Sequence, residues 1–103
     1  MSEVAVTELQ KAVESQHECH ATLLQTVPIR EMHQGAIVWD GVVSIFRLTD
    51  NPNAKVAYAW SHQLEGDNHR FFAVLQSGII ASPVAAVRAA IMAEARREGR
   101  QKL

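Results

Sequence analysis

The chain has 103 residues, of which 48% are hydrophobic and 20% are charged, and its formal net charge is −1 at pH 7. This composition excludes an intrinsically disordered chain, and the length is that of one domain. The single cysteine, Cys19, excludes an intrachain disulfide, and no apolar run approaches the roughly 18 residues of a membrane span.

We therefore predict one domain over residues 1–103 with an ordered core at about 7–98. The N-terminus lacks the basic flank and apolar core of a signal peptide, so a cytoplasmic location without a membrane partner is expected. Residues 1–52 hold seven acidic and three basic side chains, and residues 53–103 hold four acidic and seven basic ones. Such an asymmetry can steer two copies together or attract an acidic partner.

The first predicted element is an amphipathic helix from Thr7 to about Thr26, because apolar residues recur there at spacings of three and four. Thr7 followed by Gln10 fits a capping box at its start. Pro28 would end it, because the residue before a proline is disfavoured in helical angles.

Three strands are predicted next, at residues 37–48, 56–61 and 70–76, where β-branched and aromatic residues are frequent. The connections at 49–53 and 65–68 are dense in turn-forming residues. Short connections between consecutive strands favour an antiparallel meander.

A second helix is predicted to begin at Ser82-Pro83, which supply an N-cap and a proline at the first helical position. Its inward stripe would be formed by Val84, Val87, Ile91 and Ala95. Gly99 is placed to stop it, just beyond a basic last turn.

The order helix, strand, strand, strand, helix predicts a two-layer α+β fold. In this α-β-β-β-α arrangement, both helices would cover one face of a three-stranded antiparallel sheet. The other face would also be apolar, because neighbouring positions such as Ile45 and Phe46 are both apolar and point to opposite sides. An exposed apolar face of this size favours a partner, most simply a second copy.

The leading functional hypothesis is accordingly a homodimeric, non-enzymatic binding or assembly module with an unidentified protein or small-molecule ligand. The residues that we expect at a partner interface are aromatic or apolar side chains of the strands and one arginine of the second helix: Val43, Phe46, Tyr58, Trp60, Phe72 and Arg88. Because the outer face is not assigned, one of Val43→Glu and Phe46→Glu is expected to unfold the chain and the other to give a folded monomer.

Two alternatives use other features. A nucleic-acid-binding accessory protein would use the basic residues of the second helix and the C-terminus, although binding to a phosphate backbone usually needs a broader excess of positive charge; these residues are Arg88, Arg96, Arg97, Arg100 and Lys102. A small-molecule binder would need a pocket between the helices and the sheet.

The evidence for metal binding or catalysis is weaker than the evidence for a partner interface. His17, Cys19 and His20 could share a metal ion. Without a further ligand motif, we interpret them as structural residues. No serine or cysteine stands in a recognised nucleophile motif, and the five glycines are scattered rather than gathered in a phosphate-binding loop. No enzymatic activity, cofactor or metal is predicted.

With the order α-β-β-β-α, the chain resembles the double-stranded-RNA-binding-domain family, and residues 82–91 are similar to the final helix of that family. In that family, two lysines after the serine that starts the helix bind phosphates, whereas Pro83 and Val84 stand at those places here. The resemblance therefore implies the fold rather than RNA binding. The segment from Trp39 to Ser61 also resembles small uncharacterised bacterial proteins, which implies no activity.

Overall fold

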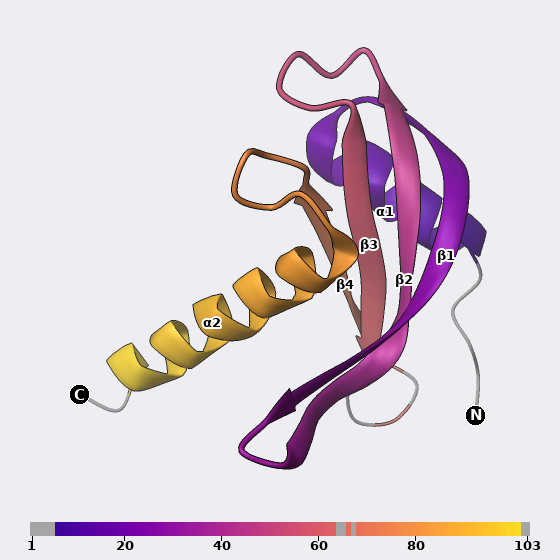
Figure 1. Ribbon diagram of the computed structural model, residues 1–103. Helices are drawn as coiled ribbons and strands as arrows, with labels where there is room; N and C mark the ends of the chain where they lie inside the picture. The colour runs from indigo at the N-terminus through magenta and orange to yellow at the C-terminus, as the bar shows by residue number, and fades with distance from the viewer. Residues whose placement is uncertain (1–5, 64–65, 67, 102–103) are drawn as a thin grey trace.

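The computed structural model describes residues 6–63, 66 and 68–101, and it contains two helices and a four-stranded sheet (Figure 1). The side chains of Val38, Gln63 and residues 95–101 are outside this description. In chain order the elements are α1 (Val6–His17), β1 (His20–His33), β2 (Ala36–Thr49), β3 (Val56–Gln63), β4 (His69–Leu75) and α2 (Pro83–Gln101).

The sheet is an antiparallel meander in the order β1-β2-β3-β4. The chain is therefore α+β, but the predicted three-stranded sheet with both helices on one face is wrong. The extra strand is β1, and α1 and α2 lie on opposite faces of the sheet (Figure 1).

The first predicted helix is wrong in its second half, because α1 ends at His17 and β1 begins at His20. Glu18 follows the helix with a φ of 50°, in the left-handed region that commonly ends helices. The register of β1 against β2 shifts between Leu23 and Gln25. This bulge interrupts the alternation of a strand and leaves apolar residues at helix-like spacings, which explains the error.

A two-residue turn joins β1 to β2. Gln34 and Gly35 have φ values of 53° and 81°, and His33 pairs with Ala36 across the turn. Two consecutive positive φ values are typical of a type I′ hairpin, whose twist matches that of the strands. Pro28, which was predicted to end the first helix, instead lies within edge strand β1, where a proline is tolerated.

The three predicted strands are confirmed as β2, β3 and β4, and the turn at 49–53 is confirmed between β2 and β3. In that turn, the side-chain carbonyl of Asn51 accepts hydrogen bonds from the backbone N–H groups of Asn53 and Ala54, at 2.8 and 2.9 Å. The connection at 65–68 falls largely outside the described residues.

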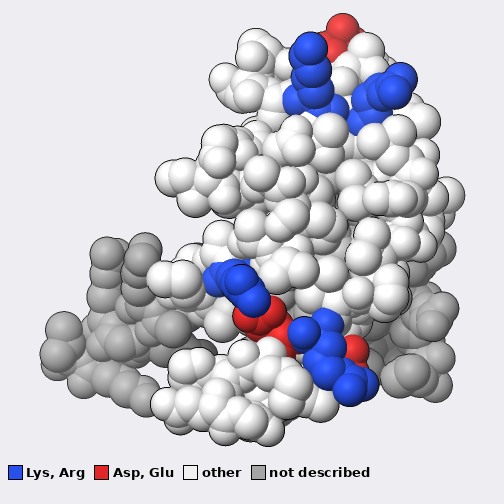
Figure 2. All heavy atoms as spheres, viewed as in Figure 1, with Lys and Arg blue, Asp and Glu red and all other residues white. Residues whose placement is uncertain are grey.

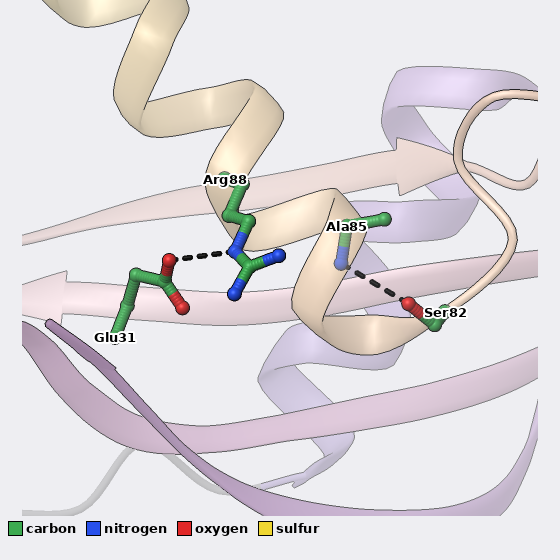
Figure 3. A network of polar contacts seen from close by, with 4 residues as sticks. All are labelled: Glu31, Ser82, Ala85 and Arg88. Atoms are coloured by element: carbon green, nitrogen blue, oxygen red, sulfur yellow. Dashed lines mark hydrogen bonds and ion pairs between the residues drawn. The ribbon is translucent and has the colours of Figure 1, made fainter.

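The predicted start of the second helix is also confirmed. The Ser82 hydroxyl accepts a hydrogen bond from the backbone N–H of Ala85 at 3.2 Å, as an N-cap does (Figure 3). The predicted stop at Gly99 is wrong, because α2 continues to Gln101. Among the described residues, no helix is both long enough and apolar enough to cross a membrane.

Each helix completes a separate core. The core on the α1 side joins Leu9 and Val13 of α1 to Cys19, which precedes β1, and to apolar residues of the sheet, namely Ala21, Phe46, Leu48, Ala57 and Ala59. The core on the α2 side joins Ala86 and Val87 of α2 to Ile29, Val43, Ile45, Tyr58 and Trp60. The second apolar face is thus covered by α2, so the bare face from which a dimer was predicted does not exist.

Candidate interaction surface

The β1–β2 hairpin extends beyond the rest of the sheet (Figure 1). The two strands pair from His20 and Thr49 down to His33 and Ala36, whereas β3 pairs with β2 only at residues 44–47. Residues 28–42 therefore form a two-stranded extension, which we call the arm. Its two faces have different surroundings.

On the α2 side, the arm is fixed to the body by aromatic packing. The ring of Trp39 contacts Trp60 edge-on, with centroids 6.0 Å apart, and Trp60 stacks on Phe72 at 5.2 Å. The Trp39 indole lies over Gly41, because a methyl group at Gly41 would stand 2.7 Å from Trp39 Cζ2. A glycine at this position lets the indole reach Trp60.

Two ion pairs hold α2 on the same face. The Arg88 Nε atom lies 2.6 Å from Glu31 Oε1 of β1 (Figure 3), and Arg70 Nη1 of β4 lies 2.5 Å from Glu94 Oε1. The two pairs join α2 to β1 through Arg88 and to β4 through Glu94. Figure 2, viewed from this side, shows basic and acidic side chains next to one another on the lower part of the molecule.

On the α1 side, the arm carries apolar side chains that α1 does not cover. Directly paired residues share a face of a sheet, and Leu23 pairs with Phe46 of the core on the α1 side. Along the same face follow the pairs Thr26–Ser44, Pro28–Val42, Arg30–Asp40 and Met32–Ile37. We call the exposed apolar members of this face the apolar strip, which comprises Leu23, before the arm, and Pro28, Met32, Ile37 and Val42 of the arm.

The apolar strip is open to solvent. Leu23 is 40% exposed, and Met32, Ile37 and Val42 are between 52% and 54% exposed, while Pro28 is also exposed. An ion pair interrupts the strip, with Arg30 Nη2 at 3.3 Å from Asp40 Oδ2 and side-chain exposures of 61% and 54%. A pair as exposed as this contributes little to the stability of the monomer.

The free backbone edges of the sheet are partly blocked. Gln10 Nε2 of α1 donates to the carbonyl of Ala21 at 2.6 Å, and the Ala21 N–H donates to Glu14 Oε2 at 2.9 Å. At the opposite edge, His17 Nε2 lies 2.9 Å from the carbonyl of Ala73 in β4. Pro28 further removes one N–H from β1. Edge-to-edge pairing of two sheets is thereby disfavoured.

The structure places four of the six residues predicted at an interface inside the molecule. Val43, Tyr58 and Trp60 are buried on the α2 side, and Phe46 is buried on the α1 side. Phe72 is partly buried against Trp60, and Arg88 is exposed but bound to Glu31. The apolar strip was missed, because the sequence gives only a weak sign of the hairpin: Gly35, which supplies a positive φ at the turn.

The other candidate residues lie apart. His17 contacts the Ala73 carbonyl, Cys19 is buried, and His20 lies 3.5 Å from Asp50. Within the described residues, no group of three His, Cys, Asp or Glu side chains could hold a metal ion. Of the basic residues proposed for nucleic acid, Arg88 is paired with Glu31, and the side chains of the others are outside the described part: Arg96, Arg97, Arg100 and Lys102.

No family model, curated protein or solved structure matches this chain. The resemblance to double-stranded-RNA-binding domains stays a prediction. The element order from which it started is replaced by α-β-β-β-β-α.

Proposed function

We propose that this chain is a small, non-enzymatic binding or assembly module that forms a homodimer, with the apolar strip as its contact surface. One observation carries the proposal: the arm has its aromatic side packed on the body, while its other side presents four exposed apolar residues, with exposed Leu23 further along the same face. Exposed apolar residues gathered on one face, next to polar ones, mark interaction sites.

Burial of the apolar strip would supply the driving force. Apolar area removed from water stabilises a complex by about 25 cal/mol per Å². The strip is short, because it has five apolar residues and one ion pair, whereas a standard interface has about 20–30 residues a side. We therefore expect a dimer with a dissociation constant in the micromolar range.

The alternatives receive less support from the contacts. A small molecule between the helices and the sheet would compete with side chains that already fill both cores. A nucleic-acid phosphate that bound Arg88 would compete with the Glu31 carboxylate for its guanidinium group. Both alternatives stay predictions, and the oligomeric state separates them from the proposed function.

The substitution Val42→Glu is expected to weaken the dimer at least about tenfold and to leave the fold unchanged, because Val42 is 54% exposed. Thr22→Glu is the matched control: Thr22 is exposed on β1 but pairs with Arg47, on the other face. Sedimentation velocity over a concentration series measures both variants beside the wild type. A wild-type chain that stays monomeric to millimolar concentration, or equal weakening by both substitutions, would contradict the proposed function.

A further inference from the structure

Resting on the proposed function, we infer that two copies pair face to face through their arms, with a two-fold axis passing between Arg30 and Asp40. In this arrangement, each Arg30 lies over the partner's Asp40. The inference concerns which residues of the apolar strip meet, and it can fail while the strip remains the contact surface.

The two charged residues that interrupt the apolar strip, Arg30 and Asp40, support this pairing. Arg30 and Asp40 lie side by side on paired strands, between the apolar pairs Pro28–Val42 and Met32–Ile37 of the same face. A second copy that overlapped this pair in the wrong register would bury a charge against an apolar side chain or a like charge, which is costly. A two-fold axis between the two residues avoids both, because it places positive over negative twice.

The same axis matches the apolar residues. Symmetry that exchanges the two strands also places Pro28 over the partner's Val42 and Met32 over the partner's Ile37, since these residues are paired across the hairpin. Every contact then occurs twice, as an interface between identical copies requires. The four charges form one network, in which each carboxylate meets two guanidinium groups and screening by solvent is reduced.

The axis that these pairs require runs along the arm, because each residue lies over the partner's residue at the same level of the hairpin. The two bodies therefore lie at the same end of the dimer, with their α1 helices on the facing sides. Helix α1 contacts β1 at Ala21 through Gln10 and Glu14. Arg30 lies nine residues further along the same strand, and nine residues of extended chain span about 30 Å, so the charges meet at a distance from α1.

The test is a charge complementation between two variants. Arg30→Asp and Asp40→Arg are each expected to weaken self-association at least about tenfold, because each brings like charges together across the axis. An equimolar mixture of the two is expected to recover dimers within about threefold of the wild-type affinity, since every contact across the axis is then between opposite charges. The double variant Arg30→Asp/Asp40→Arg is expected to dimerise as the wild type does.

Complementation excludes a purely local explanation. Each single variant also has like charges within its own arm, and this defect persists in the mixture, so recovery requires contact between copies. Native mass spectrometry, with one variant labelled with ¹⁵N, counts heterodimers against homodimers. Val42→Glu is run in parallel. If Val42→Glu abolishes a wild-type dimer but the mixture stays monomeric, the two-fold pairing is wrong and the proposed function stands. If the wild type is monomeric, both are wrong.

Discussion

Val43→Glu and Phe46→Glu are each expected to leave the chain unfolded. Both side chains are fully buried, Val43 against α2 and Phe46 in the core that contains Leu9 and Val13 of α1. An ionised carboxylate in such a place costs several kcal/mol, whereas a domain of this size is stable by only about 5–15 kcal/mol in total. Circular dichroism during heating should show no cooperative transition for either variant.

This result differs from the expectation drawn from the sequence, in which one of the two substitutions would give a folded monomer. That expectation assumed a bare face, and the structure has a helix on each face. Val42→Glu provides the contrast, because Val42 is next to Val43 in the sequence but its side chain is half exposed. A folded, monomeric Val43→Glu protein would show that α2 does not cover its face as described.

Trp60→Ala is expected to destabilise the fold by about 3–5 kcal/mol, as the loss of a large buried aromatic side chain does. Trp60 is 2% exposed, and its ring contacts both Trp39 and Phe72. Trp39→Ala should cost less, because Trp39 is only partly buried and lies at the end of this aromatic row. Urea denaturation measures both changes.

The order of the two effects is the informative outcome. If Trp39→Ala proves as costly as Trp60→Ala, the arm contributes to the central core and does not extend beyond it. If neither substitution lowers the urea midpoint, the packing of the aromatic row is wrong.

The sequence predicted the elements whose local signals agree with one another. The strands β2, β3 and β4 have β-branched and aromatic residues between clear turn formers, and α2 has both a serine cap and a proline at its first position. In these segments, composition, periodicity and boundary residues indicate the same structure.

The segment from His20 to His33 had conflicting signals. The bulge between Leu23 and Gln25 disturbs its alternation, and helix α1 ends at a glutamate with positive φ rather than at a glycine. Missing this one strand changed the strand count and the faces that the helices cover. The apolar strip was not recognised for the same reason, because Leu23 fell within the predicted helix and Met32 fell between the predicted elements.

Which face of the sheet each helix covers also depends on contacts between residues far apart in the chain, and local sequence patterns do not show these contacts. Ile45 and Phe46 are both apolar, so either face of β2 could have been left open. Ala86 and Val87 of α2 pack on strand residues far from them in the chain, and this packing covers the second face. Tertiary contacts of this kind decide which apolar residues remain exposed.

The central claim is that copies of this chain meet through the apolar strip of the arm. A dilution series of ¹H–¹⁵N correlation spectra, from millimolar to micromolar protein, tests it residue by residue. The amide signals of Met32, Ile37 and Val42 are predicted to shift with concentration, while those of Leu9 and Val87 in the two cores stay in place. Spectra that do not change with concentration, or shifts confined to α2, would contradict the claim.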